Sequence, residues 1–413
     1  MKKVIIIGAG AQGNVVAGVL SETDDIGTIV LADIDIDRAN EVATALGSPK
    51  IHTARVDASD LDAMTALISE GGYDVVVNVM ITDFNRNIIE AALAAKANYV
   101  DMASNELLES SREHTPQDRF LVEQLDYARE FEAAGLKAFI LVGGDSGLVN
   151  VMAREAADEL DEVAYIGIKD YGIVECSKLV GLWSLPIYLV DCADDPIWWE
   201  DGEYKTGEAF SGEEDYYFHP PLDVKGKVYY HQHEEPITIP QFIGKPVGYC
   251  DFKMGEPGSE TWQFIIQELG LMSPDPIDVN GIEVAPMDVF LKLLPKTLAP
   301  KKCMEMVKNG ELFSRLQLAV DVKGKKNGKE YHHKLWSESP NIVEACDRIA
   351  GTNDVSYITS LPISIATLMI LRGQLKKDGV FPPETLDREE REVFFKGLKE
   401  WGITVHKQVN EVV

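Results

Sequence analysis

The segment Tyr229-Tyr230-His231-Gln232-His233-Glu234-Glu235-Pro236 holds the densest group of side chains that could move a proton. In an alternating strand, His231, His233 and Glu235 would share one face. A carboxylate beside an imidazole fixes its tautomer and makes it an oriented base. We therefore predict that His233 and Glu235 are catalytic and that His231 contacts a substrate. A polar strand face, or a hydrogen-bond network between domains, would use the same residues.

A metal centre is the second chemistry that this segment could support, because closely spaced histidines and acids bind zinc in proteins. No third spaced histidine stands near His231 and His233, so we expect no metal site. The five cysteines are scattered and never form a C-x-x-C pair. A disulfide framework is therefore not expected, and the composition fits a reducing cytoplasm.

The run Gly8-Ala9-Gly10-Ala11-Gln12-Gly13 has the G-x-G-x-x-G spacing of a dinucleotide-binding loop, and Asp33 follows twenty residues later. Gly8 permits a tight turn, and Gly10 lets a pyrophosphate approach backbone N–H groups where a helix begins. Gly13 lets that helix pack closely on the preceding strand. Asp33 should accept hydrogen bonds from the ribose hydroxyls and repel a 2′-phosphate. We therefore predict NAD as cofactor, with NADP less favoured.

Further cofactor contacts are expected at the start of this helix and at the carboxyl ends of the strands, where ligands bind in open parallel sheets. The candidates are Ala11, Gln12, Asp57, Asn78, Val79 and Met80. Asp57 would lie near the adenine, although capping of the next helix explains it equally well. Asp101 ends a later strand, close to where a nicotinamide should lie, and is a third catalytic candidate; helix capping again explains it as well.

These residues need a parallel sheet that is covered by helices on both faces. The first third of the chain predicts strands at 4–7, 28–32, 51–56, 75–79, 99–100 and 137–142, and helices at 11–20, 38–46, 61–68, 88–95 and 115–134. Apolar strands that alternate strictly with helices are typical of a doubly wound α/β fold. We expect a Rossmann domain over residues 1–145.

The pattern changes after Gly147. A helix at 148–160 leads to alternating strands such as 164–168 and 316–322, and residues 313–324 and 330–338 suggest an antiparallel hairpin. We expect a substrate-binding and dimerisation α+β domain over 146–355, built on a mixed or antiparallel sheet. The remaining residues, 356–413, predict a helical segment that partly returns to the Rossmann domain.

The composition is that of a globular protein with an acidic surface. The 413 residues suit about two domains, and the formal net charge is −29. This charge repels phosphate backbones and anionic lipid, so we expect no nucleic-acid or membrane partner. It serves solubility or attracts a cationic substrate, such as a diamine or a basic amino acid. Residues 357–371 form the most apolar stretch, which is too short to span a bilayer. We expect a soluble, cytoplasmic protein.

Several motifs resemble the saccharopine dehydrogenase-like family, within it lysine ε-dehydrogenases and carboxynorspermidine dehydrogenases. They are the glycine fingerprint, Tyr99-Val100-Asp101, the 144–150 segment that leads into Val151-Met152-Ala153, and Gly379-Val380-Phe381-Pro382-Pro383-Glu384. The resemblance implies oxidation of a carbon that bears an amine, or reduction of an imine, with nicotinamide as hydride partner. It also implies a homodimer. Ser146 departs from the family, which commonly has a proline there.

Three other residues are candidates for substrate contacts. Trp183 falls where related enzymes carry a tryptophan near the amine pocket, and its ring could hold an ammonium group; a core tryptophan is an equal alternative. Lys253 could bind a substrate carboxylate, and Asn150 follows the glycine-rich loop. The leading hypothesis is an NAD-dependent dehydrogenase of CH–NH groups in a small amine or amino acid. The alternatives are a reductase that makes a secondary amine from an aldehyde and an amine, and a non-catalytic NAD-binding sensor or scaffold.

Overall fold

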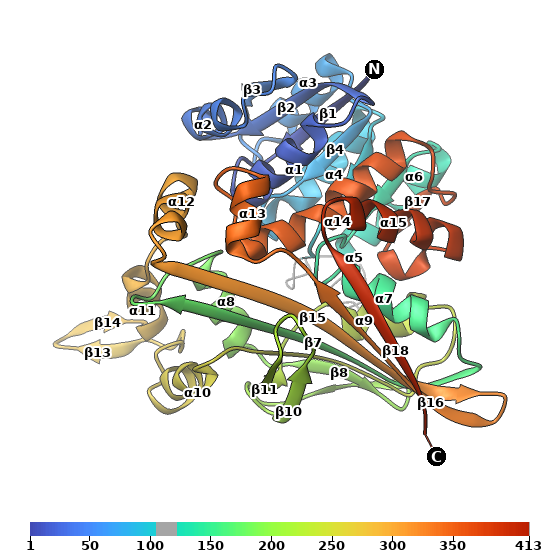
Figure 1. Cartoon of the computed structure of the whole chain (residues 1–413). Helices are drawn as coiled ribbons and strands as arrows, with labels where there is room; N and C mark the ends of the chain where they lie inside the picture. The colour runs from blue at the N-terminus through green and yellow to red at the C-terminus, as the bar shows by residue number, and fades with distance from the viewer. Residues whose placement is uncertain (105–121, 413) are drawn as a thin grey trace.

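The computed structural model describes residues 1–104 and 122–412, which form two large β-sheets and one two-stranded sheet, with helices around and between the large sheets (Figure 1). The first sheet is parallel, with the strand order β17-β6-β5-β4-β1-β2-β3. Its elements are β1 (Lys2–Ile7), α1 (Ala11–Ser21), β2 (Ile26–Asp33), α2 (Ile36–Leu46), β3 (Ile51–Arg55), α3 (Leu61–Gly71), β4 (Val75–Asn78), η1 (Thr82–Phe84), α4 (Asn85–Ala94), β5 (Asn98–Val100), α5 (Val122–Leu125), α6 (Ala128–Ala133) and β6 (Lys137–Phe139). This confirms the predicted Rossmann-type fold.

The second sheet is mixed, as the sequence predicts. It has the order β10-β11-β12-β7-β15-β16-β18, with β8 paired to β12 and β9 paired to β8. Among its described strands, the β12–β7 pair is parallel and the other pairs are antiparallel. Its elements and their neighbours are α7 (Leu148–Ala157), β7 (Glu162–Cys176), α8 (Leu185–Ala193), β8 (Ile197–Glu200), β9 (Glu203–Thr206), β10 (Glu214–Phe218), β11 (Val224–Tyr230), α9 (Glu235–Phe242), β12 (Tyr249–Gly255), α10 (Ser259–Gln263), the π-helical turn η3 (Phe264–Glu268), β13 (Ile277–Val279), β14 (Ile282–Val284), α11 (Pro286–Leu293), α12 (Pro300–Lys308), β15 (Leu312–Lys326) and β16 (Lys329–Glu338).

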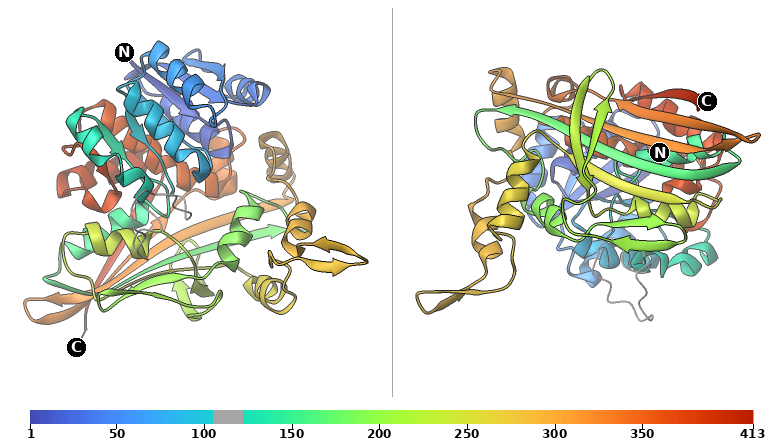
Figure 2. Two further views of the ribbon diagram at one scale, coloured as in Figure 1. Left: turned by 180° about the vertical axis from the view of Figure 1, so that it is seen from behind. Right: turned by 90° about the horizontal axis from the view of Figure 1, so that it is seen from below.

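The predicted hairpin is present as β15 and β16, which pair antiparallel around Asn327-Gly328. The second sheet extends beneath the first domain, and the small β13–β14 hairpin projects from the body (Figure 2). The predicted start of the helix at 115–134 lies outside the described residues. Its later part is divided between α5 and α6.

The C-terminal segment contributes to both sheets. Its elements are α13 (Ile342–Arg348), α14 (Asp354–Leu371), β17 (Gly379–Phe381), η4 (Pro383–Thr385), α15 (Arg388–Glu400) and β18 (Thr404–Val412). Strand β17 adds to the first sheet beside β6, and β18 adds to the second beside β16. The sequence predicts only helices here, because β17 is very short and β18 is an exposed edge strand.

Helix α14 is the apolar stretch noted in the sequence, and it begins earlier than expected, at Asp354. Its 18 residues are long and apolar enough for a membrane span, which corrects the expectation that the stretch is too short. Most of the helix is buried, and it packs against α1 and α15. Because a core helix passes the same test, its composition does not indicate a membrane.

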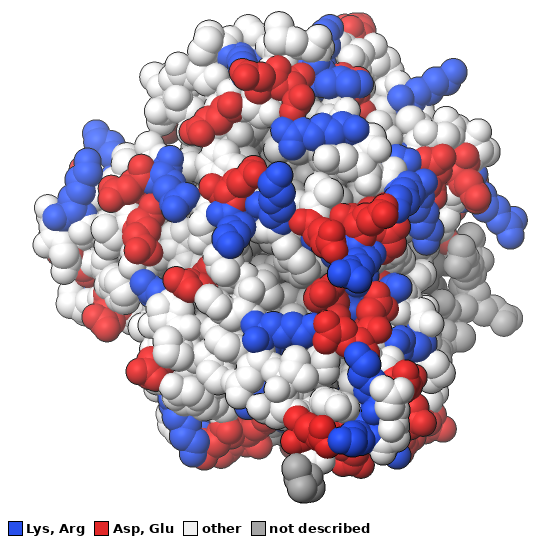
Figure 3. All heavy atoms as spheres, turned by 45° about the vertical axis from the view of Figure 1, so that its right-hand side comes forward, with Lys and Arg blue, Asp and Glu red and all other residues white. Residues whose placement is uncertain are grey.

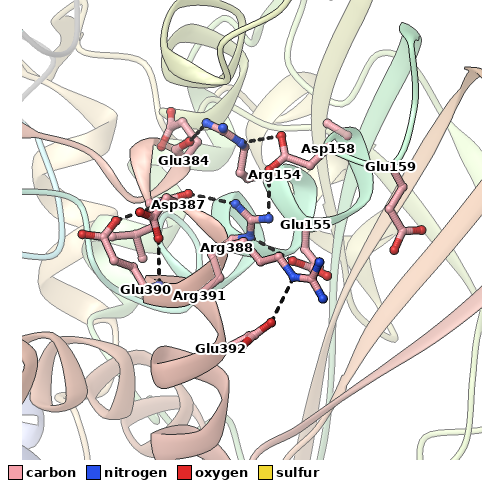
Figure 4. Close-up of polar contacts among 12 residues, drawn as sticks. Arg154, Glu155, Asp158, Glu159, Glu384, Asp387, Arg388, Glu390, Arg391 and Glu392 are labelled. Atoms are coloured by element: carbon pink, nitrogen blue, oxygen red, sulfur yellow. Dashed lines mark hydrogen bonds and ion pairs between the residues drawn. The ribbon is translucent and has the colours of Figure 1, made fainter. Parts of the chain in front are cut away.

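A buried arginine connects the C-terminal segment to α7. Arg391 of α15 is only 2% exposed and forms ion pairs with Glu155 and Asp158 at 2.9 and 2.8 Å (Figure 4). It also donates a hydrogen bond to the carbonyl of Leu386. Next to it, Arg154 donates to the carbonyl of Glu384. These bonds hold η4 and α15 against α7, the helix that follows the second glycine-rich loop at residues 143–147.

Candidate active site

The glycine loop leaves room for a pyrophosphate. Gly8 has a φ of +110°, and a Cβ there would lie 3.1 Å from the Val79 carbonyl oxygen. A Cβ on Gly13 would lie 2.0 Å from the Gly8 oxygen, so the helix could not pack as it does with any larger residue. At Gly10, by contrast, a Cβ would meet no described atom within 4 Å. The tight turn and the close packing are therefore where the motif predicts them, and the open side is where a phosphate would approach.

Asp33 is held rigidly beside this loop. Its carboxylate accepts hydrogen bonds from the backbone N–H groups of Ala9 and Asp35 at 2.7 and 2.9 Å. Arg38 reaches back from α2, and its Nε donates to the Ala9 carbonyl at 2.8 Å. Gln12, near the start of α1, has a buried Oε1 that finds no partner among the described residues. These residues fit a dinucleotide, because the open side at Gly10 lies where α1 begins and an anchored carboxylate for the ribose stands beside the loop.

The other predicted cofactor residues have different roles. Asn78 is buried and donates to Asn85 Oδ1 and the Tyr99 hydroxyl, while its own Oδ1 accepts from Met80 N. It therefore fixes the exit of β4, from which Val79 and Met80 pass close to Gly8. Ala11 lies at the first position of α1.

The side chain of Asp57 stabilises a turn and does not cap a helix. Its carboxylate accepts from the backbone N–H and the hydroxyl of Ser59, which lowers its pKa. The cap of α3 is instead Asp60, which accepts from Ala63 N.

Asp101 joins the ends of two strands. Its Oδ1 accepts from the backbone N–H of Leu141 at 2.8 Å, and its Oδ2 lies 3.4 Å from Gln124 Nε2. Burial raises the pKa of this carboxyl to about 7. Asp101 therefore lies at the carboxyl edge of β5 and β6, and its catalytic role stays a prediction.

His233 and Glu235 are in direct contact, although the strand predicted for residues 229–236 is wrong in its second half. β11 ends at Tyr230 and α9 begins at Glu235, because Pro236 fits the first turn of a helix and cannot donate to a ladder. His233 Nδ1 lies 2.5 Å from Glu235 Oε2 and 3.3 Å from Glu234 Oε2. Its ring stacks on Phe252 with 4.1 Å between centroids.

The carboxylates around His233 favour its protonated form. Burial alone would lower the pKa of its imidazole, but the carboxylates of Glu235 and Glu234 raise it well above the usual value. His231 is affected in the opposite way, because burial and the charge of His233 lower its pKa to about 3. The surroundings therefore favour the charged form of His233 and the neutral form of His231.

Three carboxyl groups that the sequence analysis missed complete this centre. Asp145 lies in the loop after β6, Asp170 lies on β7, and Asp191 lies on α8. Burial raises the pKa of all three, to about 7 for Asp145 and Asp191, and each lies within electrostatic range of His233. The peptide bond between Asp145 and Ser146 is cis. We call Asp145, Asp170, Asp191, Glu234 and Glu235 the acid group.

The acid group lies between the two domains. Glu234 accepts a hydrogen bond at 3.0 Å from the backbone N–H of Ser104, which follows β5 of the first sheet. Asp170 and Phe252 lie on one face of the second sheet, since Phe252 and Met254 are the neighbours of Ile168 and Asp170 in the β12–β7 register. A substrate bound against His233 would therefore lie between the second sheet and the carboxyl edge of the first.

Asn150 supports the loop that carries Asp145. Its Oδ1 accepts from Gly147 N at 2.8 Å, and its Nδ2 lies 3.1 Å from Thr238 Oγ1 and 3.3 Å from Glu384 Oε2. Burial raises the pKa of Glu384 to about 7. Asn150 therefore connects the loop at residues 143–147, α9 and the C-terminal segment.

The structure does not bring Lys253 to the acid group. Lys253 lies on the opposite face of the second sheet, where its ammonium is 2.8 Å from Glu214 and 3.7 Å from Asp251. Beside it, the fully buried Lys169 lies 3.1 Å from Asp251, which is 1% exposed. Lys253 is thus part of a buried ion network and not an open carboxylate site.

Trp183 packs edge-on against Tyr188, with 5.9 Å between the ring centroids. Both rings belong to one apolar cluster, and the predicted contact of Trp183 with a substrate stays a prediction.

Three side chains of this centre could also hold a metal ion. The nearest ligand atoms of His233, Glu234 and Glu235 all lie within 4.8 Å of one another. In the arrangement seen here, His233 Nδ1 is already paired with Glu235. The expectation of no metal stays a prediction.

Comparison with known proteins identifies the family. Residues 4–139 match the family model of the saccharopine dehydrogenase NADP binding domain, and residues 143–403 match that of the saccharopine dehydrogenase C-terminal domain. The chain belongs to the saccharopine dehydrogenase family. Membership confirms the resemblance seen in the sequence and makes the protein a nicotinamide-dependent oxidoreductase of CH–NH chemistry, rather than a non-catalytic sensor.

Individual saccharopine dehydrogenase relatives cover almost the whole chain. Carboxynorspermidine synthase of Vibrio alginolyticus is 29% identical, over 98% of this chain and 96% of its own. Carboxyaminopropylagmatine dehydrogenase of Synechocystis sp. is 26% identical, over 99% and 98%. The solved structure of apo saccharopine dehydrogenase (L-Glu forming) from Saccharomyces cerevisiae matches with a TM-score of 0.67 and 16% identity, over 99% of this chain and 100% of that one. The last match shows a shared fold.

Proposed function

We propose that this member of the saccharopine dehydrogenase family reduces an imine formed between a cationic amine and a carbonyl compound, giving a secondary amine of the polyamine type. The observation that carries the proposal is the contact between His233 Nδ1 and Glu235 Oε2 at 2.5 Å inside the acid group, where the carboxylates raise the pKa of the imidazole. The names of two relatives, carboxynorspermidine synthase and carboxyaminopropylagmatine dehydrogenase, support the substrate class.

The acid group favours an amine that arrives as a cation. All five of its carboxyl groups are largely buried, and burial raises the pKa of four of them. A bound ammonium group would offset the cost of ionising carboxylates away from water. Anionic substrates would meet the opposite field, so the centre selects against them.

His233 is suited to donate a proton to the imine. An imine nitrogen must be protonated before its carbon accepts a hydride, and the nicotinamide supplies that hydride when bound. Glu235 holds Nδ1, which leaves Nε2 as the ring atom that can face a substrate. The proton from Nε2 forms the N–H bond, the C=N double bond becomes single, and the neutral imidazole regains its proton from solvent. The reverse sequence oxidises the amine.

The direct test is an assay of purified protein with cationic amines, carbonyl compounds and either reduced cofactor. We expect loss of the reduced-cofactor absorbance with an amine and an aldehyde together, and a slower rise of that absorbance when the secondary amine is supplied with the oxidised cofactor instead. An uncharged alcohol of similar size is the matched control and should support neither reaction. Absence of turnover with every cationic amine, in both directions, would remove the proposal.

The cofactor proposal is NAD rather than NADP. Asp33 is anchored by two backbone donors, so its charge cannot move away from a 2′-phosphate. Replacing it in Asp33→Ser is expected to raise the ratio of kcat/KM for NADP over NAD by about tenfold, equivalent to ~1.4 kcal/mol. Asp35→Asn, two residues away, is the control and should leave the ratio unchanged. A wild-type preference for NADP would show that Arg38, beside the same loop, dominates instead.

A further inference from the structure

Cys303 and Cys346 lie side by side, although they are far apart in the sequence. Cys303 belongs to α12 and Cys346 to α13, and these two helices pack against each other. Both side chains lie in one apolar cluster, and the thiol of Cys303 forms a hydrogen bond with that of Cys346. Both thiols are free in the structure. Two sulfur atoms this close can form a disulfide with little movement of the helices that carry them.

The two thiols differ in the way that a redox pair requires. Cys303 is only 2% exposed, whereas Cys346 is partly exposed. The hydrogen bond between them lowers the pKa of Cys346 below its usual value and raises the pKa of Cys303. An accessible thiol with more thiolate character reacts first with an oxidant, and a neighbouring thiol then resolves the product.

Hydrogen peroxide can join the two sulfur atoms in two steps. The Cys346 thiolate attacks the peroxide, the O–O bond breaks, and the sulfur becomes a sulfenic acid while water leaves. The Cys303 sulfur then attacks the sulfenic sulfur, so that an S–S bond forms, the S–O bond breaks and a second water leaves. In total, the two thiols lose two electrons and two protons, and one peroxide becomes two water molecules.

The thiol of Cys346 also holds the turn that follows α13, at residues 349–352. Its Sγ donates a hydrogen bond to the carbonyl of Thr352, at 2.8 Å. A disulfide sulfur carries no hydrogen, so oxidation removes this bond. The start of α12 packs on the same turn, because a Cβ on Gly351 would lie 2.4 Å from the Cβ of Pro300. Displacement of α12 therefore acts on the turn as well.

The turn supports the helix that follows the first glycine loop. The side chain of Asn14, which is 2% exposed, donates to the carbonyl of Ala350 at 3.1 Å. Ile349 packs against the same helix, and one of its methyl carbons lies 3.1 Å from the position that a Cβ on Gly18 would take. Because α1 begins where a pyrophosphate would bind, a change in this turn can alter dinucleotide binding without reaching the acid group.

We propose that Cys303 and Cys346 form a redox-sensitive pair, in which a peroxide-generated disulfide releases the turn at residues 349–352 and weakens dinucleotide binding. The inference goes beyond the proposed function, because it concerns the cofactor site and holds whichever amine the protein accepts. In a reducing compartment, a disulfide of this kind is transient and forms only on oxidation.

Peptide mapping and cofactor titration of the full chain test the two parts of this proposal. The reduced protein is treated with hydrogen peroxide, the peroxide is removed, and the remaining thiols are alkylated before digestion without reductant. We expect a linked pair of peptides that contains Cys303 and Cys346. Fluorescence titration with NADH should give a Kd about threefold or more above that of the reduced protein, the size expected when one hydrogen bond is lost. A dithiol reductant should restore the original value.

Cys346→Ser is the central variant, because its hydroxyl can still donate to the Thr352 carbonyl but cannot form a disulfide. It should bind NADH as the reduced wild type does and show no response to peroxide. Cys346→Ala lacks the donor and should bind NADH about threefold more weakly without any peroxide. Cys176→Ser is the matched control, since it removes another partly exposed thiol of the same cluster and should keep the wild-type response.

Absence of the linked peptides, or a link from either cysteine to Cys176 instead, would overturn the redox pair. An unchanged Kd in the linked protein would overturn the effect on the cofactor site. Cys303→Ser is a second variant that cannot form the disulfide. If peroxide weakened its NADH binding as much as that of the wild type, the disulfide would not be the cause and the proposal would be wrong.

Discussion

Replacing His233 with glutamine is expected to lower kcat by about 10²–10⁴-fold, because the imine then loses its positioned proton donor. The glutamine amide keeps a polar side chain over Phe252 but cannot transfer a proton. Cofactor affinity should not change, since the glycine loop and Asp33 lie on the first domain and do not contact His233. Steady-state turnover and cofactor fluorescence titration measure the two quantities separately.

Glu235→Gln gives a second measurement of the same centre. Without this carboxylate the pKa of His233 falls, because Glu235 is the main group that raises it. We expect the alkaline limb of the kcat profile to move to lower pH, a change that a merely structural role would not produce. His406→Gln on β18 is the control, since that ring pairs with Glu338 far from the centre. A kcat within threefold of wild type for His233→Gln would contradict the assignment.

Removing the buried ammonium of Lys169 is expected to lower the free energy of unfolding by about 3 kcal/mol. In Lys169→Met, the buried carboxylate of Asp251 keeps only its longer contact with Lys253 and a hydrogen bond at 3.2 Å from the Tyr249 hydroxyl. A buried charge without a close partner costs more than the lost attraction alone. Urea unfolding followed by tryptophan fluorescence measures the difference.

The double variant Lys169→Met with Asp251→Leu separates the ion pair from its surroundings. It removes both charges, so it should recover most of the lost stability. Lys225→Met is the matched control, because its pair with Asp215 is exposed on both sides and should contribute less than about 1 kcal/mol. If Lys169→Met were as stable as Lys225→Met, the network would not be the stabilising element described here.

The geometry of the glycine loop could be predicted from the sequence because its signals are local. Gly8, Gly10, Gly13 and Asp33 lie within one strand–helix–strand unit, so their spacing fixes their geometry. The contact between His233 and Glu235 was predicted on the assumption that both lie in one strand. The strand β11 ends before them, at Tyr230, but the contact still forms because the two residues are only two positions apart.

The rest of the centre could not be predicted, because it depends on tertiary packing. Asp145, Asp170 and Asp191 come from a loop, a strand and a helix that no local pattern brings together. Adjacent charges at Lys169 and Asp170, inside an otherwise apolar strand, were the available signal. Because neighbours in a strand face opposite sides, Lys169 belongs to the ion network and Asp170 to the acid group.

The sequence predicts the sign of the surface charge but not how the charged side chains are distributed over the surface. On the face shown in Figure 3, acidic and basic side chains are intermixed and form no large patch of one sign. The carboxyl groups with the strongest chemical consequence are instead buried between the domains. Some of the acidic residues therefore belong to the acid group between the domains, and the net charge alone does not reveal them.

Strand β17 has a consequence for biosynthesis. Roughly 240 residues separate it from β6, the strand beside which it pairs, and α14, which covers α1, is also made late. At ribosomal speeds of about 5–20 residues per second, the first sheet waits on the order of 10–50 s for its last strand. Throughout that interval the nascent chain exposes the face of α1 that α14 later covers and the open edge of the sheet at β6.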